Sequence, residues 1–423
     1  MESFASLGLC APLIRAVTDL GYEAPTPVQV AAIPAILEGR DIWGSARTGS
    51  GKTAAFVLPI LQVVAERGDG ARARSGSARV LVLVPTRELA AQIAGAIASY
   101  GRALPSRVKT CLAVGGVSIN PQMIALRGGA DIVVATPGRL LDLVDQNALR
   151  LASVETLVLD EADRLLSLGF AEELTRVLAL LERHQTLLFS ATFPPPVREL
   201  AARLLDRPVR VAIDGGASLP ETSELILQRA IEVDTPTRTM LLRHLLETQG
   251  WSRVLVFVAS RYAADHVVEK LRRAGVQSAA LHGGLSQGAR TLALSDFKAE
   301  RIRVLVATDL AARGIDVAQL PAIVNYDLPR SPVDYVHRIG RTARAGQTGT
   351  AVSFVTAESD AHFRLIERRH HLCLARERIA GFEPGAAAAL ARAADPHGGV
   401  KGKRKSKKDK LRELAASKLD PTS

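Results

Sequence analysis

Eight residues, ARTGSGKT from Ala46 to Thr53, place two glycines, a lysine and a threonine where a phosphate-binding loop needs them. The segment follows a short hydrophobic stretch and precedes a helical one, so backbone N–H groups at the helix start would point at phosphates. Lys52 would add a charge near the β- and γ-phosphates, and Thr53 would offer a hydroxyl to Mg²⁺. Ala46 stands where the strict pattern has glycine, which leaves a tight strand–helix turn without a ligand as the alternative.

A second group of chemical residues lies in LVLDEADRLL, at the end of a later aliphatic stretch. Asp160 is placed to hold Mg²⁺, and the adjacent Glu161 is placed to orient or deprotonate a water molecule. The alternative is an ordinary acidic helix N-terminus, where the helix dipole favours carboxylates. The phosphate loop upstream favours the metal interpretation.

Smaller polar motifs accompany these two. LLFSATF puts Ser190 and Thr192 at another predicted strand end, where their hydroxyls would link sites by hydrogen bonds or only cap a helix. GYEAPTPVQ carries Tyr22 and Gln29. A glutamine amide has both the donor and the acceptor that an adenine edge requires, and an aromatic ring packs on the base.

Three arginines recur at steps of three in HRIGRTARAG, namely Arg338, Arg341 and Arg344. A solvated helix face is the ordinary explanation for such a run. However, the second half of the chain lacks a phosphate loop, since the turn after RVLVFVAS reads RYAADH. A single nucleotide would then serve both halves, and a guanidinium from the second half would stabilise charge on its γ-phosphate during phosphoryl transfer.

The elements that must position these residues are short aliphatic segments alternating with segments of helical spacing, such as residues 85–104. This alternation is typical of parallel sheets with helical crossovers. The predicted strands of the first half are residues 41–46, 79–86, 108–116, 131–137, 154–163 and 186–192. Those of the second half are residues 229–234, 253–260, 276–284, 302–309, 322–329 and 350–356.

The predicted fold class is therefore α/β, with two tandem domains that are each a parallel sheet covered by helices. We place the first domain at residues 1–213, a Gly/Pro/Ser-rich linker at 214–224 and the second domain at 225–384. Residues 67–77 are predicted to form a mobile surface loop. Residues 385–423 are predicted to be a flexible tail, first Ala-rich and then Lys-rich.

The net charge and the composition indicate which chemical class of molecule the chain binds. The formal net charge is +11, and from Gly398 onward nine Lys/Arg against three Asp/Glu contribute +6 of it. A polyanion is the expected partner, although a merely solubilising tail is the alternative. Cys10, Cys111 and Cys373 have no metal-type spacing and suit a reducing cytoplasm. No apolar run is long enough to span a bilayer, and no signal peptide is predicted.

Taken together, the motifs make the chain resemble a DEAD-box ATP-dependent RNA helicase of the bacterial type, over roughly residues 4–382. The family's motifs occur in order as PTPVQ, ARTGSGKT, PTRELA, GG, TPGRL, DEAD, SAT, VFVAS, HGGLSQGAR, ATDLAARGID and HRIGRTARAG. This resemblance implies two RecA-like domains, with ATP and Mg²⁺ between them and RNA across both.

The resemblance also implies roles for individual residues. The nucleotide would be bound by Phe4, Tyr22, Gln29, Ala46, Arg47, Thr48, Gly49, Ser50, Gly51, Lys52, Thr53, Gly314 and Asp316, with Gln29 reading adenine. Catalysis would involve Lys52, Asp160, Glu161, His337, Arg341 and Arg344. Of these, Glu161 would act as base, the last two as arginine fingers, and His337 would bridge toward the acidic motif. Thr53 and Asp160 would hold Mg²⁺ largely through water. Ser190, Thr192 and Asp309 would couple hydrolysis to RNA, and RNA would be held by Arg87, Gly116, Thr136, Arg139, Gln287, Arg290 and Thr308.

Three positions depart from the commonest family pattern: Ser167, Gly284 and Ala343. The expected activity is RNA-stimulated ATP hydrolysis that unwinds or remodels short RNA duplexes non-processively. An ATP-gated RNA clamp or scaffold and a DNA translocase are the alternatives. The chain is expected to be a cytoplasmic monomer without a membrane role, acting on ribosomal precursor particles or with RNA-decay machinery.

Overall fold

The computed structural model describes residues 3–45, 50–67, 75–212, 225–312, 319–343 and 348–385. The predictions for the linker at 214–224, for most of the loop at 67–77 and for the tail beyond residue 385 lie outside these residues. No helix in the described parts of the chain has the length and apolarity that crossing a bilayer requires.

The first half of the chain forms a seven-stranded sheet in which every pairing is parallel, in the order β3-β4-β2-β5-β6-β1-β7. The strands are β1 (Ile42–Ser45), β2 (Ala78–Leu83), β3 (Thr110–Ala113), β4 (Ala130–Ala135), β5 (Thr156–Leu159), β6 (Gln185–Ser190) and β7 (Val209–Ala212). The connecting elements are η1 (Phe4–Leu7), α1 (Ala11–Asp19), α2 (Pro27–Leu37), α3 (Lys52–Glu66), α4 (Arg87–Gly101), α5 (Asn120–Leu126), α6 (Pro137–Asp145), α7 (Ala162–Ser167), α8 (Ala171–Leu178) and α9 (Pro195–Leu204).

The second half repeats this arrangement. Its sheet has the order β10-β11-β9-β12-β13-β8-β14, which becomes the order of the first sheet when seven is subtracted from each number. The strands are β8 (Ile226–Glu232), β9 (Val254–Val258), β10 (Ser278–Leu281), β11 (Val304–Thr308), β12 (Ala322–Asn325), β13 (Gly349–Val355) and β14 (Arg376–Glu377). The connecting elements are η4 (Thr235–Thr237), α10 (Arg238–Thr248), α11 (Arg261–Arg273), α12 (Gln287–Lys298), α13 (Asp309–Ala312), α14 (Pro332–Ile339) and α15 (Asp360–His370).

Both faces of each sheet are covered, which explains why central strands such as β5 and β9 are apolar at nearly every position rather than at alternate ones. In β2, Val80 and Val82 pack with α1–α4, whereas Leu81 and Leu83 pack with α6–α9 on the opposite face. In β9, Val256 joins α10 and α11, whereas the adjacent strand residues face α12 and α13. Burial of these aliphatic faces is the main stabilising contribution to each lobe.

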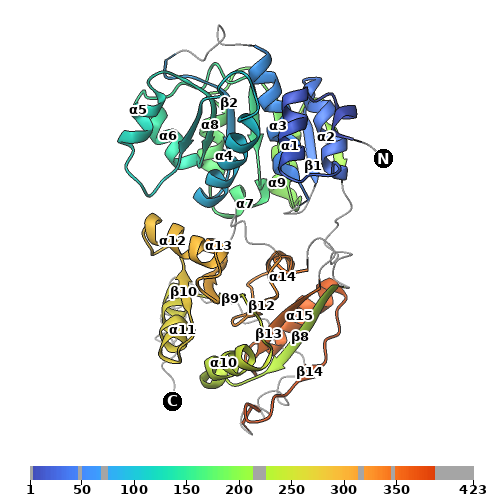
Figure 1. Cartoon of the computed structure of the whole chain (residues 1–423), viewed down its shortest axis with the longest axis vertical. Helices are drawn as coiled ribbons and strands as arrows, with labels where there is room; N and C mark the ends of the chain where they lie inside the picture. Colours follow the sequence, from blue (N-terminus) through green and yellow to red (C-terminus); the bar gives the residue numbers. More distant parts are fainter. Residues whose placement is uncertain are drawn as a thin grey trace, which may run out of the picture.

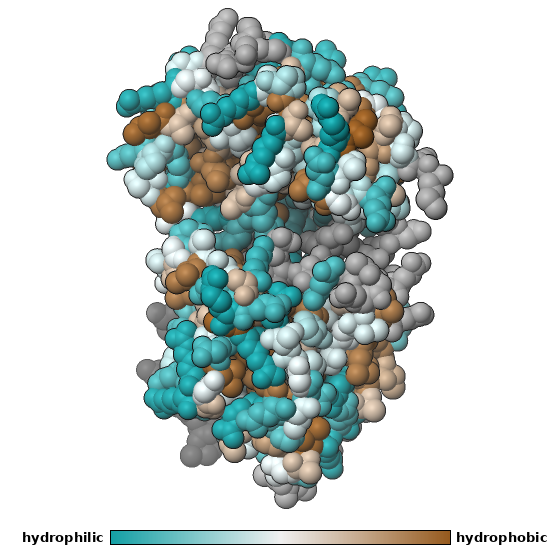
Figure 2. Space-filling view, viewed as in Figure 1, coloured by the Kyte–Doolittle hydropathy of each residue, from teal (hydrophilic) through white to brown (hydrophobic). Residues whose placement is uncertain are grey.

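The two sheets form two lobes, one above the other in Figure 1, with α7 at the lower end of the upper lobe and α12, α13 and α14 at the facing end of the lower lobe. Figure 2 shows hydrophobic residues in separate patches among hydrophilic ones on this face of both lobes. Because loops at the carboxyl ends of parallel strands share one edge of a sheet, each lobe presents its motif loops together.

All twelve predicted strands are present, and the helix predicted within residues 85–104 is α4. The sequence missed one strand in each lobe, β7 and β14. Both are edge strands that pair on one side only, with β1 and β8 respectively. The edge strands β3 and β10 were predicted, but β7 is the four residues VRVA and β14 only the two residues RE, so these two lack an aliphatic signal.

Strand β1, which leads into the predicted phosphate loop, is closely packed at Gly44. A Cβ atom built on Gly44 would lie 2.3 Å from Cδ1 of Phe189, whose fully buried ring also contacts that of Phe56. We expect Gly44→Val to lower the free energy of unfolding by about 2 kcal/mol, because the Phe189 ring has no space to move into. Urea unfolding followed by circular dichroism measures this change.

Gly95→Ala is the matched control, since nothing lies within 4 Å of its Cβ position and it is exposed on α4. Its replacement is expected to be neutral or to stabilise α4 by up to about 1 kcal/mol. Equal unfolding midpoints for Gly44→Val and the unmodified chain would contradict the close-packing argument.

Candidate active site

Residues at the start of α2 fix Gly51, which lies at the described end of the predicted phosphate loop. Gly51 has φ +92°, and a Cβ atom there would lie 2.5 Å from the Gln29 Nε2 atom. The buried Gln29 amide accepts a hydrogen bond from the Thr26 N–H at 2.9 Å and donates one to the Gly51 carbonyl at 3.2 Å. Glycine is therefore required at position 51 both for its backbone conformation and for the close approach of Gln29.

Lys52 begins α3 and faces the acidic motif that follows β5. Asp160 and Glu161 are both buried, and burial raises the pKa of each carboxyl. The charge of Lys52 opposes this rise for both groups. For Glu161 the neighbouring Asp160 raises the pKa further, while Arg341 from the second lobe lowers it. The buried acidic turn thus carries an excess of negative charge that favours nearby cations.

The third carboxylate of this motif connects the acidic turn to β6. Asp163 accepts hydrogen bonds from the Thr192 N–H at 3.1 Å and from the Thr192 hydroxyl at 2.6 Å. In return, Ser190 Oγ accepts from the Asp163 N–H at 3.2 Å and donates to the Thr192 carbonyl at 2.7 Å. The two hydroxyl residues therefore link the ends of β5 and β6, and Ser190 also satisfies a backbone N–H in the first turn of α7.

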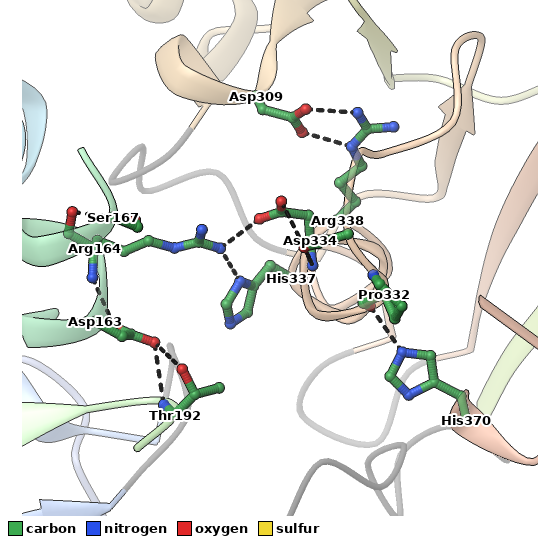
Figure 3. A network of polar contacts seen from close by, with 11 residues as sticks. Asp163, Arg164, Ser167, Thr192, Asp309, Pro332, Asp334, His337, Arg338 and His370 are labelled. Carbon is green, nitrogen blue, oxygen red and sulfur yellow. Dashed lines mark hydrogen bonds and ion pairs between the residues drawn. The ribbon is translucent and has the colours of Figure 1, made fainter. Parts of the chain in front are cut away.

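The next residue, Arg164, crosses to the second lobe (Figure 3). Its guanidinium donates to Asp334 Oδ1 at 2.7 Å, in an ion pair whose side chains are only 13% and 12% exposed. It also donates to Nδ1 of His337. Burial, together with the Arg164 charge, lowers the pKa of His337 to about 4, so the ring is neutral near pH 7 and accepts this bond.

The arginines of HRIGRTARAG do not share one helix face, because α14 ends at Ile339 with Gly340 as its C-cap. The solvated-face explanation is wrong for both described members, since Arg338 is 2% exposed and Arg341 is 8% exposed. Arg338 is held within its own lobe. It contacts both Asp309 oxygens at 2.6 and 2.7 Å, the Asn325 side chain at 3.0 Å and the Asp327 carbonyl at 2.7 Å.

Arg341 has a different environment. It lines one small pocket between the lobes together with Lys52, Glu161, Asp163, Arg164, Ala191 and His337. The cation of the second lobe therefore faces the lysine and carboxylates of the first. This arrangement suits a polyanionic group bound in the seam and attacked by a water molecule beside a carboxylate.

A second cleft between the lobes has an arginine-rich wall. It is lined by Pro85, Thr86, Arg87, Glu88, Gly115, Gly116, Thr136, Leu168, Phe170, Arg261, Gly283, Arg290, Leu310 and Ala311. Arg87 donates to the Gly115 carbonyl at 3.1 Å, and its Nη1 atom occupies the space where Gly116 would carry a side chain. Arg139 also stabilises this loop, because it donates hydrogen bonds to the Val114 and Val117 carbonyls at 2.9 Å each.

The cleft is closed by a pair from opposite lobes. Arg290 Nη2 lies 2.8 Å from Glu88 Oε1, and both side chains are 6% exposed. Burial lowers the pKa of Arg290, and Glu88 opposes this effect. Arg290 Nε and Gln287 Oε1 are buried without a hydrogen-bond partner, which is the condition expected of groups that bind a polar ligand. Thr308 ends β11, immediately before the α13 residues that line the cleft.

The predicted aromatic residues form a cluster. Phe4 is buried and meets Tyr22 edge-on at 6.5 Å between ring centroids, and the Tyr22 hydroxyl lies 3.1 Å from that of Tyr100. Burial raises the pKa of Tyr100, so its hydroxyl stays protonated. Phe4 thus supports Tyr22 from within the core.

Several predicted residues lie outside the described parts of the chain: Ala46, Arg47, Thr48, Gly49, Gly314, Asp316 and Arg344. Of the remainder, Ser50 and Thr53 flank the Gly51–Lys52 turn. Among the described residues no group of three or more His, Cys, Asp or Glu side chains has the arrangement of a metal site. Thr53 and Asp160 fit Mg²⁺, which binds through one or two carboxylates and completes its shell with water and phosphate oxygens.

The sequence missed residues that act through partners distant in the chain. Arg164 and Asp334 are 170 positions apart, and Glu88 meets Arg290 from the other lobe. Arg164 and Glu88 lie inside motifs quoted above, so position in a motif was an available signal for them, whereas Asp334 lies outside those motifs. The identity of the partner depends on how the lobes are placed, which local spacing does not encode.

Comparison with known proteins agrees with this geometry. The DEAD/DEAH box helicase family profile matches residues 26–200, and the helicase conserved C-terminal domain profile matches residues 237–346. Over 369 residues the chain is 41% identical to DEAD-box ATP-dependent RNA helicase CshA of Bacillus cereus, which covers 87% of this chain and 68% of the relative. It is 42% identical over 373 residues to DEAD-box ATP-dependent RNA helicase 28 of Arabidopsis thaliana, covering 87% and 46% respectively.

Solved structures support the fold. Dbp5 of S. cerevisiae bound to RNA and ADP BeF3 matches with a TM-score of 0.77 and 28% identity, covering 94% of this chain and all of that one. A DEAD box protein from the hyperthermophile Methanococcus jannaschii matches with a TM-score of 0.51 and 35% identity, covering 89% and 99%. The predicted fold class of two tandem RecA-like domains is confirmed.

The contrast between the two described arginines yields a stability test. We expect Arg338→Ala to lower the free energy of unfolding by about 3 kcal/mol, because it leaves the Asp309 carboxylate and the Asn325 amide without their buried partner. Arg341→Ala is expected to cost less, because Arg341 lines the pocket between the lobes, whereas Arg338 is the partner of a carboxylate inside its own lobe. Urea unfolding measures both variants, and equal losses would contradict the division of roles.

Proposed function

Since the chain belongs to the DEAD-box family of ATP-dependent RNA helicases, we propose that it binds ATP in the small pocket between its lobes and one RNA strand in the arginine-rich cleft. The observation that carries this proposal is the composition of the pocket, where Lys52 and Glu161 of one lobe face Arg341 of the other. ATP completes the site only when the lobes are together. Binding therefore closes them over RNA, and hydrolysis releases them.

In this proposal Lys52 and the backbone of the loop bind the β- and γ-phosphates, and Arg341 stabilises the charge that develops on the transferred group. Thr53 and Asp160 would hold Mg²⁺, which when bound neutralises charge on the phosphate oxygens. Glu161 accepts a proton from the attacking water. Its raised pKa suits this role, because a carboxylate of higher pKa is a stronger base. Gln29 would read adenine as well as fix Gly51.

The coupling between the two sites follows the Asp163 contacts. Thr192 and Ser190 connect the acidic turn to β6, and the adjacent Arg164 connects it to Asp334 and His337. Separation of the lobes breaks the Arg164 contacts and withdraws Arg341 in the same movement. We propose that RNA in the cleft stabilises the closed arrangement and thereby stimulates hydrolysis.

The cleft suits a nucleic-acid backbone rather than particular bases. Its polar wall consists of arginines and glycine-rich loops, which are groups that contact phosphates and sugars without reading sequence. Local strand separation by bending one strand is the activity we favour. A clamp without unwinding and a DNA translocase would use the same pocket. Strand-displacement assays beside nucleotide-dependent pull-down distinguish the clamp, and ATPase stimulation by RNA and by DNA distinguishes the translocase.

We expect Lys52→Ala to abolish RNA-stimulated phosphate release, and Arg341→Ala to lower kcat about 1,000-fold with little change in KM for ATP. Arg243→Ala, at an exposed position on α10, is the matched control and should retain turnover. A phosphate-release assay with RNA and with DNA of the same sequence should show stimulation by RNA alone. Retained turnover in Lys52→Ala would refute the proposal, and equal stimulation by DNA would favour the translocase.

The basic tail is proposed to add non-specific affinity for RNA. It leaves the second lobe at Gly385, whose N–H donates to Asp234 at 2.8 Å at the carboxyl end of β8. Three strand spacings, about 14 Å, separate this point from the end of β9, where the cleft residue Arg261 lies. The covalent length of residues 386–423 is sufficient to cover this distance, because an extended chain gains about 3.3–3.6 Å per residue.

Removal of residues 398–423 should weaken RNA affinity and flatten its salt dependence, while turnover at saturating RNA stays nearly unchanged. The reason is that phosphate contacts by the nine Lys/Arg of this segment release counterions, and the number of contacts sets the slope of log affinity against log salt. Fluorescence anisotropy at several salt concentrations measures the slope. An unchanged slope would mean that the tail does not contact RNA.

Action in the cytoplasm as a monomer, on ribosomal precursor particles or with RNA-decay machinery, is part of the same proposal. The free cysteines Cys10, Cys111 and Cys373 support the cytoplasmic part of this proposal, because a reducing compartment keeps thiols unpaired. Crosslinking to RNA in cells, followed by sequencing of the attached fragments, identifies the physiological substrate.

A further inference from the structure

Tyr262, the second residue of α11, is the most exposed large hydrophobic side chain among the described residues, at 77%. Aromatic residues make up only 4% of the chain, and the other described tyrosines are far less exposed. Leaving a phenol ring in water forfeits the stabilisation that its burial would provide.

The ring has support on one side only. The imidazole of His266, one helical turn further along α11, lies nearly parallel to it, with an interplanar angle of 10° and 5.8 Å between centroids. The helix beneath is fixed by the buried side chains of Val267, Val268 and Leu271 and by the Ser260 cap. Tyr262 is therefore an aromatic surface on a rigid element.

Its neighbours place this surface beside the arginine-rich cleft. Arg261, the preceding residue, lines the cleft and lies across Gly283 and Gly284. The acidic groups nearby are already engaged, since Asp265 bonds to Nε2 of His282 at 2.9 Å and Glu269 pairs with Arg273. Arg261 thus offers a phosphate a positive charge beside the ring, and the charge of Glu269 is paired with that of Arg273.

We propose that Tyr262, supported by His266, is a stacking platform for one nucleobase of the RNA strand where it leaves the cleft past Arg261. This inference rests on the proposed RNA-binding function. Every base has a π-face, so stacking adds affinity without adding sequence specificity, in keeping with the backbone contacts of the cleft.

A protein partner fits this surface less well. Tyr262 is the only exposed large hydrophobic residue that the structure describes on α11, and the charged residues Arg261 and Asp265 are exposed beside it. Docking of an apolar protein surface requires a contiguous patch, whereas a single ring between charged residues is sufficient for a base.

The first test compares Tyr262→Ala with Tyr262→Phe, using fluorescence anisotropy of a labelled single-stranded 12-nucleotide RNA in the presence of a non-hydrolysable ATP analogue. We expect Tyr262→Ala to weaken binding about five- to tenfold and Tyr262→Phe to bind nearly as well as the unmodified chain. Met240→Ala, at another exposed apolar position on α10, is the control and should bind normally. Unchanged affinity in Tyr262→Ala overturns the proposal.

The second test locates the base. RNAs carrying a single abasic site at successive positions are bound to the unmodified chain and to Tyr262→Ala. At one position near an end of the bound segment, the abasic site should weaken binding to the unmodified chain but cause no further loss in Tyr262→Ala. Equal losses in both proteins at every position overturn the platform.

Salt dependence separates stacking from charge. Tyr262→Ala should leave the slope of log affinity against log salt unchanged, whereas Arg261→Ala should reduce it by about 1. Normal RNA binding and RNA-stimulated turnover in all Tyr262 variants would refute the platform alone. Absence of RNA binding by the unmodified chain would instead refute the proposed function.

Discussion

The acidic turn after β5 is the constraint around which the two lobes are arranged. Three carboxylates, Asp160, Glu161 and Asp163, lie buried within one turn, and burial of like charges is unfavourable unless cations lie close. Lys52 supplies one from the same lobe, and Arg341 supplies another only from across the seam. The first lobe alone therefore has an electrostatically incomplete site. A charged ligand and the second lobe complete it together, which makes lobe closure and ligand binding parts of one equilibrium.

Burial of Arg338 inside the second lobe fixes the position of Arg341, which follows it in the same segment. Arg338 is fixed by four hydrogen bonds inside the second lobe and by packing of its guanidinium over the Phe257 ring at 4.8 Å. Because α14 ends directly after it, Arg341 turns away from the lobe toward the seam. Asp309, which pairs with Arg338, begins α13, and α13 lines the arginine-rich cleft. The same ion pair thus connects a strand end at the cleft to the segment that carries Arg341.

The sequence was sufficient to predict those features of the fold that depend on residues close together in the chain. Aliphatic runs located every central strand, because burial acts at those positions directly. The strands β7 and β14 escaped because they are short and contain charged residues, so neither has an aliphatic run. The spacing of the arginines also did not predict that Arg338 and Arg341 have different environments. Residues three apart share a face only within one helix, and α14 ends between these two. Pairs such as Arg164–Asp334 depend on lobe placement, which no segment specifies by itself.

Two strained residues lie on opposite sides of the active-site region. Glu161 has φ +53° and Ala343 has φ +52°, a left-handed conformation that costs a non-glycine residue about 1 kcal/mol. Ala343 tolerates it because it is 2% exposed and packs against Ile339 and Tyr335 in the core of the second lobe. Glycine would relieve the strain but would also give the backbone next to Arg341 more freedom. Alanine at this position therefore exchanges a little stability for a more rigid presentation of Arg341, which favours a site whose cation is already oriented when the lobes close.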